Sequence, residues 1–446
     1  MKQESTSSST NDRAWDIVVL GATGDAGMAI STYIADNYET YTKGGSNRLR
    51  WAIAGRSKEK LESLKSRLAS DDVGVLICPD VGNTELMRDL ASSTKILVSA
   101  VGPYTLLGET IFQACALQGT HYVDVTGEVD WVGRMKQRYQ EEAKRSGSTL
   151  CSFAGYDCVP CDIMLYLAHK ELSICDGGSA VITSLENVCY TPNGVFPRGT
   201  IRTTISKLPE LSTFVGSLVR YAGSDGRFHW RTAIALIRWL LPKWSPEFGA
   251  FTIPNYMGWC NIPVVYGSHN AYLKCTFHDR FAAPNSKDYF LSAIILLFFF
   301  LVAFAPVFVL LQIAVFFVPS TAQLLLKRFD SLDYRGNSKD KQNQMDTATT
   351  DVWSYAKSSS GSMATVHLHV EGDAGIKATG LLAGETIFSM LELLDQGKLP
   401  RGVIGSPSGI VGDTLVERLQ DEKTIGHLCT LTVSVVDEAS SKKKGD

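Results

Sequence analysis

Charged residues are missing from one long stretch of the chain. No Asp, Glu, Lys or Arg occurs between Asp288 and Lys327, and this run exceeds the ~20 apolar residues with which a helix crosses a bilayer once. Pro306 lies near its middle, where its ring and its missing amide donor break or kink a helix. The run predicts a membrane-associated segment over 289–326, as one kinked span or as a hairpin. We favour the hairpin because each arm is short for a full crossing, and a buried pair of core helices is the alternative.

The chain also lacks an excess of positive charge. Its formal net charge is -3 and its pI is about 6.3, which disfavours a nucleic-acid partner. No apolar secretory region opens the sequence, because residues 1–11 are polar and rich in Ser and Thr. Ten cysteines in 446 residues do not make a small disulfide scaffold, so we expect reduced thiols and an intracellular protein.

The first third of the chain alternates short apolar runs with longer amphipathic stretches. At 446 residues two structural units are expected, and strands interleaved with helices such as 57–70 predict a doubly wound parallel sheet of the Rossmann type. The predicted strands are 16–20, 49–54, 73–78, 95–100, 120–125 and 148–153.

After about His169 the pattern changes to longer alternating segments, which are typical of an antiparallel sheet with one wet face. We therefore expect a second domain of the α+β class, which would hold the substrate. Its alternating segments are 179–190, 199–206, 271–281, 363–373 and 428–438. The predicted organisation is a disordered tail (1–13), a dinucleotide-binding domain (14–165) and the α+β domain (166–446), interrupted by the apolar segment 289–326 and a polar mobile loop (330–362).

A glycine-rich turn lies between the first predicted strand and the helix after it. Its spacing, G-x-x-G-x-x-G, lets the backbone approach a pyrophosphate while the first helical amides point at the negative charge. A bare packing turn is the alternative. We expect the turn to bind a dinucleotide through Gly21, Ala22, Thr23, Gly24, Asp25, Ala26 and Gly27.

The end of the second predicted strand distinguishes NAD from NADP. An NAD site places a carboxylate there for the ribose 2′-hydroxyl, whereas a 2′-phosphate favours positive charge and small donors. This chain has Arg56 and Ser57 there and no acid, which predicts NADP(H). Ser57 is also expected to cap the next helix.

Further candidate residues follow the later strands, where ligands bind in open α/β sheets. Asp80 follows the third strand, near the expected adenine. Val101, Gly102 and Pro103 end the fourth strand and would bring backbone close to the nicotinamide ribose.

A nicotinamide enzyme also needs a proton donor, because the cofactor carries the hydride. Our catalytic candidates are Tyr104, Tyr156 and Asp157, and Tyr104 is favoured because it adjoins the nicotinamide loop. Asp124 and Glu128 are further acids at a strand end. Asp124 and Asp157 are equally suited to capping backbone amides.

Five motifs stand in a fixed order: G-A-T-G-x-x-G, A-G-R-S, V-G-P-Y, D-x-T-G-E and G-Y-D-x-x-P-x-D. With the uncharged run and a late G-D-A-G-I-K-A-T-G, they resemble the saccharopine dehydrogenase-like oxidoreductase family, over almost the whole chain. That family includes the trans-acting enoyl reductases of lipid and polyketide assembly. The resemblance implies an NADP-binding Rossmann domain, a second α+β domain and, in eukaryotic members with the apolar segment, association with membranes or lipid droplets.

Some patterns favour structural explanations over chemistry. Cys158 stands where the family commonly has Ser, and with Cys161 it forms a C-x-x-C. Small residues packing a helix start are favoured over a redox pair, and no metal site is expected. The residues that match the Y-x-x-x-K of short-chain dehydrogenases, Tyr166 and Lys170, are interpreted as a chance match.

Two histidines of the last third share one face of a predicted strand. His367 and His369 are two residues apart, as metal ligands can be, but no carboxylate partner is evident from the sequence. We expect them to be solvent-facing histidines.

Three functions remain open at this point. The favoured one is a membrane-associated NADP-dependent reductase acting at a C=C bond of an apolar acyl, polyketide or lipid substrate on a lipid droplet or organelle membrane. The others are a saccharopine-type dehydrogenase acting on a C–N bond and a non-catalytic nucleotide-binding membrane protein. A homodimer is compatible with each.

Overall fold

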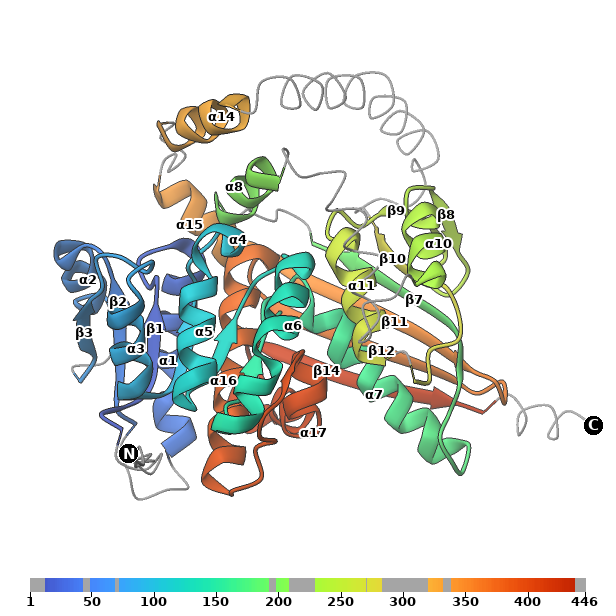
Figure 1. Cartoon of the computed structure of the whole chain (residues 1–446). Helices are drawn as coiled ribbons and strands as arrows, with labels where there is room; N and C mark the ends of the chain where they lie inside the picture. Colours follow the sequence, from blue (N-terminus) through green and yellow to red (C-terminus); the bar gives the residue numbers. More distant parts are fainter. Residues whose placement is uncertain are drawn as a thin grey trace, which may run out of the picture.

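The chain folds around two seven-stranded sheets, which Figure 1 shows beside one another. The computed structural model describes residues 13–42, 49–68, 72–191, 198–207, 229–269, 271–282, 320–331 and 338–437. Residues 289–319 of the predicted apolar segment and residues 1–12 of the predicted tail lie outside this description. Within the described ranges, no helix is long and apolar enough to cross a membrane.

The first sheet is parallel throughout and has the order β13-β6-β5-β4-β1-β2-β3. Ile17, Val18 and Val19 in its centre are fully buried because helices cover both faces, which is why these strands are apolar runs. The predicted doubly wound class is confirmed. The strands are β1 (Trp15–Leu20), β2 (Trp51–Gly55), β3 (Gly74–Ile77), β4 (Thr94–Ser99), β5 (His121–Asp124), β6 (Leu150–Cys151) and β13 (Ile404–Gly405).

The helix predicted over 57–70 begins where the sequence indicates and is observed as α2 (Lys58–Lys65). The Ser57 hydroxyl accepts a hydrogen bond from the Lys60 amide at 3.4 Å, so the predicted cap is confirmed. Arg13, predicted to lie in the disordered tail, is buried and donates to the Ala91 carbonyl at 3.1 Å. The helices are α1 (Asp25–Thr42), α2 (Lys58–Lys65), α3 (Thr84–Ser93), α4 (Tyr104–Leu107), α5 (Glu109–Gln118) and α6 (Val129–Ser146).

The end of the chain returns to the first unit. β13 extends the parallel sheet by pairing Ile404 with Leu150, and α16 packs against α1 so closely that a Cβ on Gly380 would lie 2.9 Å from the Ala29 backbone. The predicted boundary at 165 falls inside α7. A two-residue strand from a distant segment leaves no periodic pattern to detect. The helices concerned are α7 (Val159–Cys175), α16 (Thr379–Asp395), α17 (Pro407–Gln420) and α18 (Glu422–Ile425).

The second sheet has the order β14-β12-β11-β7-β10-β9-β8. It is mixed instead of antiparallel, because β7 and β10 run parallel, with Phe277 opposite Leu185. Between these two strands the described chain forms α8 (Arg198–Lys207), α10 (Trp230–Trp239), β8, β9 and α11 (Gly258–His269). The strands are β7 (Ile182–Tyr190), β8 (Lys243–Ser245), β9 (Ala250–Pro254), β10 (Phe277–Phe281), β11 (Thr349–Ser358), β12 (Met363–Glu371) and β14 (Cys429–Val436).

Two predictions for this unit are wrong. The predicted strand 199–206 is part of the helix α8 (Arg198–Lys207), because packing against α14 and α1 outweighs the strand propensity of its Thr and Ile residues. The predicted mobile loop 330–362 contains a helix and a ten-residue strand, β11, whose buried face is made partly of Ser and Ala, which hides its alternation. The remaining elements are α10 (Trp230–Trp239), α11 (Gly258–His269), α14 (Ser320–Ser331), α15 (Ser338–Thr347) and the π-helix η4 (Ala374–Ala378).

Candidate functional site

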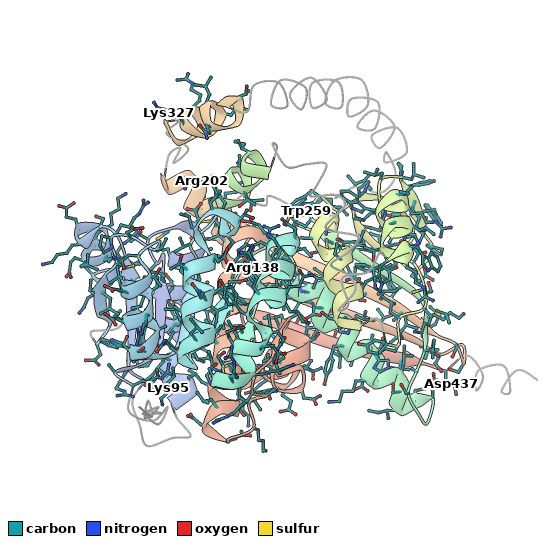
Figure 2. All side chains as sticks on the ribbon, in the orientation of Figure 1. Lys95, Arg138, Arg202, Trp259, Lys327 and Asp437 are labelled. Atoms are coloured by element: carbon teal, nitrogen blue, oxygen red, sulfur yellow. The ribbon has the colours of Figure 1, made fainter. Side chains whose placement is uncertain are left out.

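A cleft of about 1170 Å³ lies at the carboxyl ends of β1, β2, β4 and β5. The first unit contributes the glycine turn, one face of α2 and the loops after β4 and β5. The second unit contributes α8, α11 and the region around η4, and Figure 2 shows Arg202 of α8 and Trp259 of α11 at this end of the molecule. The predicted site residues that line the cleft are Thr23, Gly24, Asp25, Ala26, Arg56, Gly102, Tyr104 and Asp157.

The three glycines of the turn have different surroundings. Gly21 has a φ of +82°, which favours glycine, and a Cβ on Gly27 would lie 2.3 Å from the Gly21 carbonyl oxygen. Gly24 lines the cleft, and a Cβ there would meet only that same oxygen, at 3.4 Å. Gly21 and Gly27 therefore shape the turn, while Gly24 leaves its backbone open to a pyrophosphate. The turn fits the predicted dinucleotide.

Two cations that the sequence analysis missed line the cleft beside Arg56. Lys60 lies on α2 and Arg67 in the turn just after it, whereas Ser57 does not line the cleft and uses its hydroxyl as the helix cap. The signal was present, because residues 60, 63, 64 and 67 have the spacing of one helix face and all four line the cleft. This positive charge suits a 2′-phosphate.

Glu128 holds the loop that is predicted to contact the nicotinamide. Its carboxylate accepts the backbone amides of Tyr104 at 2.6 Å and Thr105 at 3.0 Å, and it is fully buried. The loop after β5 therefore fixes the loop after β4, in which Gly102 lines the cleft. The predicted Val101 and Pro103 are not among the lining residues.

Asp124 has a structural role. Its carboxylate accepts hydrogen bonds from the amides of Thr126 and Phe153, each at 3.1 Å, and from the Ser152 hydroxyl at 2.9 Å. Burial raises the pKa of Asp124 to about 6, against the effect of these donors. The expectation that this acid caps backbone amides is confirmed. Asp80 similarly accepts the Gly82 amide, at 2.8 Å, and lies outside the cleft lining.

The two candidate tyrosines are both buried. The Tyr104 hydroxyl donates to the Ser99 carbonyl at 2.8 Å, which commits its proton to the backbone. The Tyr156 hydroxyl has no hydrogen-bond partner among the described residues and lines a small cavity beside Cys189. Burial raises the pKa of both phenols well above the usual range, so neither readily loses a proton.

Asp157 is placed differently from the other acids. It precedes the N-terminus of α7 and lines both the large cleft and the small cavity. Its carboxyl has no hydrogen-bond partner within the described part of the chain, and burial alone raises its pKa to about 7. A carboxyl with this pKa is about half protonated near neutral pH, and among the described residues it has no hydrogen-bond acceptor for that proton.

The remaining motifs take structural roles. Cys158 and Cys161 are buried at the start of α7, as expected, and the Cys158 sulfur lies 3.9 Å from that of Cys260. The Lys170 ammonium pairs with Asp413 of α17 at 2.7 Å, and neither it nor Tyr166 lines the cleft. In the described ranges no group of His, Cys, Asp and Glu could hold a metal ion.

The histidine prediction needs one correction. Asp351 on the neighbouring strand is the carboxylate partner that the sequence did not reveal, since its Oδ1 lies 2.9 Å from both His367 Nε2 and His369 Nδ1. The pairing depends on the register of β11 against β12, which places Asp351 opposite His369.

A sequence model described as the saccharopine dehydrogenase NADP binding domain matches residues 17–151. That stretch runs from β1 to β6 and contains the glycine turn, Arg56 and Glu128. Residues 17–151 are a saccharopine dehydrogenase NADP-binding domain. The predicted cofactor class and the predicted resemblance are confirmed by this match. Arg56, Lys60 and Arg67 therefore belong to an NADP-binding domain.

Individual proteins match different lengths of this chain. The saccharopine dehydrogenase-like oxidoreductase of Mus musculus is 31% identical over 194 residues, 42% of this chain and 44% of the relative. The chain thus matches less than half of that protein's length. A Mycobacterium tuberculosis protein named as a candidate trans-acting enoyl reductase is 26% identical over 420 residues, 91% of this chain and 96% of the relative.

Two further comparisons concern a lipid-associated relative and the fold. The lipid droplet localized protein of Caenorhabditis elegans is 30% identical over 205 residues, 45% of this chain and 46% of that protein. The solved saccharopine dehydrogenase of Saccharomyces cerevisiae aligns with a TM-score of 0.52 at 12% identity, over 95% of this chain and 100% of that one. The two-sheet architecture is therefore shared with that enzyme.

Proposed function

We propose that this protein is a membrane-associated, NADP-dependent reductase that reduces a C=C bond of an apolar acyl or lipid substrate. The observation that carries the proposal is Asp157, a protonatable carboxyl that has no hydrogen-bond partner among the described residues. It lies in the cleft that the NADP-binding turn and Gly102 also line. Bound NADPH would supply the hydride. Asp157 would supply the proton to the other carbon, so that both electrons and the proton are accounted for.

Other residues of the cleft would bind and orient the cofactor and the substrate. Glu128 holds the nicotinamide loop through the Tyr104 and Thr105 amides. Arg56, Lys60 and Arg67 would hold the adenosine end of the cofactor. The opposite wall of the cleft includes Met257 and Trp259, apolar side chains that suit an acyl group. Asp157 replaces Tyr104 as our first candidate because the Tyr104 proton is committed to the Ser99 carbonyl.

The substrate class is supported by relatives as well as by the cleft. The relative named as a candidate trans-acting enoyl reductase aligns along nearly the full chain, and another relative is named for lipid droplets. The uncharged run between Asp288 and Lys327 adds an apolar segment that a soluble amino-acid substrate does not need. These observations favour C=C over C–N chemistry.

The decisive experiment measures NADPH oxidation by the full chain with enoyl thioesters of increasing acyl length. Asp157→Asn should lower turnover about 10²- to 10⁴-fold with little change in NADPH affinity. Because the acid must be protonated and its pKa is raised to about 7, wild-type turnover should be full below that pH and fall as pH rises through it. The exposed Asp89→Asn on α3 is the matched control.

Three results would contradict the proposal. Asp157→Asn with wild-type turnover and an unchanged pH profile would remove Asp157 as the proton donor. Oxidation of a secondary amine such as saccharopine, without turnover of any enoyl thioester, would show that the protein is a dehydrogenase acting on a C–N bond. NADPH binding without oxidation by either substrate class would establish a non-catalytic protein.

A further inference from the structure

The outward face of α10 and the strand after it carry large apolar side chains. Trp230 is 60% exposed, Ile237 66%, Leu241 60% and Trp244 49%. The inward face of the same helix is already packed, since Thr232 and Ala235 are buried there. The core therefore does not account for these outward side chains. An exposed cluster of this kind marks a contact site.

The charges of this segment are all of one sign. From His229 to Ser245 the chain contains Arg231, Arg238 and Lys243 and no acid. Arg231 and Arg238 donate to the neutral oxygens of Leu273 and Thr276, and the Arg231 guanidinium lies 5.5 Å from the Trp230 ring centroid. Tryptophan and basic residues interleaved with aliphatic ones are typical of the boundary between lipid headgroups and acyl chains.

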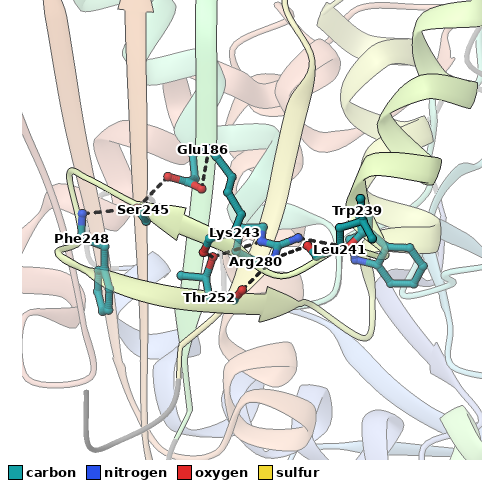
Figure 3. A network of polar contacts seen from close by, with 8 residues as sticks. All are labelled: Glu186, Trp239, Leu241, Lys243, Ser245, Phe248, Thr252 and Arg280. Carbon is teal, nitrogen blue, oxygen red and sulfur yellow. Dashed lines mark hydrogen bonds and ion pairs between the residues drawn. The ribbon is translucent and has the colours of Figure 1, made fainter. Parts of the chain in front are cut away.

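A buried arginine holds this segment in place. Arg280 of β10 donates to the carbonyls of Trp239 at 3.0 Å and Leu241 at 2.7 Å, the last turn of α10 and the link to β8 (Figure 3). Lys243 of β8 pairs with Glu186 at 2.9 Å. The apolar side chains are thus presented by fixed backbone.

The uncharged run leaves the described fold close to this segment. The chain passes out of the described part after β10, on which α10 packs, and the last residues of the run, 320–326, form the first half of α14. α14 also shows an exposed apolar side chain, Leu324 at 67%, close in sequence to Lys327 and Arg328. Figure 1 shows α14 at the top left of the molecule and α10 on its right, and Figure 2 labels Lys327 on α14. The end of the run thus also presents an exposed apolar side chain beside cations.

We infer that α10 and β8 form a lipid-docking surface for an anionic phospholipid layer. The α10–β8 surface consists of Trp230, Ile237, Leu240, Leu241 and Trp244 with Arg231 and Arg238, because Lys243 is already paired with Glu186. Its apolar side chains enter the acyl boundary while its cations meet headgroup phosphates. The inference rests on the proposed function only in placing the protein at a membrane, and it does not depend on the proposed reaction. The α10–β8 surface would be a second membrane contact beside the uncharged run.

The test uses flotation of the full chain with vesicles of phosphatidylcholine, with and without phosphatidylserine. Ile237→Gln/Leu241→Gln should lower the bound fraction about tenfold or more on both vesicles, because two large apolar groups no longer leave water. Arg231→Gln/Arg238→Gln should lower binding about thirtyfold on the anionic vesicles, since each basic residue near such a surface contributes about 1 kcal/mol, and little on the neutral ones. Ile174→Gln, 67% exposed on α7, is the matched apolar control and should float like the wild type.

Unchanged flotation of both double variants would overturn the inference and leave the uncharged run as the membrane contact. A lower oligomeric mass of Ile237→Gln/Leu241→Gln without a change in flotation would also overturn it, by showing a second copy on the surface. NADPH affinity verifies that each variant is folded. Turnover of a water-soluble short-chain enoyl thioester reports on the proposed reaction separately, so failure of one proposal leaves the other standing.

Discussion

The two units hold their loops by different means. In the first, Glu128 and Asp124 accept hydrogen bonds from backbone amides of loops at the ends of neighbouring parallel strands. Both acids belong to the D-x-T-G-E motif, and Glu128 binds the amide of Tyr104 in the V-G-P-Y motif. In the second, Arg280 holds backbone from segments about forty residues earlier in the chain. Carboxylates at strand ends that fix loops are visible in the sequence as a motif. A cation that fixes backbone distant in the chain, such as Arg280, can be recognised only in the folded structure.

The first unit contains a smaller contrast of the same kind. Asp124 and Asp157 both follow parallel strands, and burial raises the pKa of both. Asp124 accepts three hydrogen bonds, whereas Asp157 has no partner among the described residues. The hydrogen-bond donors around each carboxyl therefore distinguish Asp124, which holds loops, from Asp157, which is available for chemistry. Their sequence motifs do not.

The largest expected effect comes from removing Arg280, which holds backbone segments of the second unit that are distant in the chain. Arg280→Met should lower the free energy of unfolding by about 3 kcal/mol or more, because buried carbonyls lose a charged donor. Urea denaturation followed by tryptophan fluorescence measures this. The exposed Arg138→Met on α6 is the control and should change little. An Arg280 variant as stable as the wild type would contradict the comparison.

The next effect tests the contrast between the two carboxyls. Asp124→Ala should cost about 2 kcal/mol, since two amides and a hydroxyl lose their acceptor. Asp157→Ala should not lower stability above pH 7, because a carboxyl with a raised pKa costs stability when it ionises. Thermal unfolding at pH 8 compares the two, and equal losses would show that Asp157 also has a structural role.

A third change separates folding from binding within the glycine turn. Gly24→Ala should weaken NADPH about tenfold, because its Cβ would occupy the cleft, while the melting temperature stays near that of the wild type. Titration calorimetry measures the affinity. Gly409→Ala on α17, where a Cβ meets nothing within 4 Å, is the control. Unchanged affinity would place the pyrophosphate elsewhere.

The smallest effect concerns cofactor choice. Arg56→Ala should weaken NADPH by about tenfold and leave NADH almost unchanged, because only NADPH carries the 2′-phosphate. Lys58→Ala, two residues on and outside the cleft lining, should affect neither cofactor. Equal losses for both cofactors would show that Arg56 does not contact the 2′-phosphate.

The parts of the site that were predictable share a physical basis. The turn around Gly24, Arg56, Gly102 and Asp157 all follow apolar parallel strands, and such strands end at one edge of the sheet. Arg202 and Trp259 were not predicted because they come from the second unit, whose helices reach the cleft only after the chain has folded. β13 and β11 were missed because the first is too short and the second too polar on its buried face.

The sequence alone determined the parallel sheet, the nucleotide turn and the preference for NADP, because each depends on residues close together in the chain. It also revealed the uncharged run. The tertiary structure decided which acids hold loops, and that Asp157 lines the cleft with no hydrogen-bond partner in the described part of the chain, since a donor can come from any distance along the chain. It also decided that the outward face of α10 is apolar, because burial is a property of packing and not of composition.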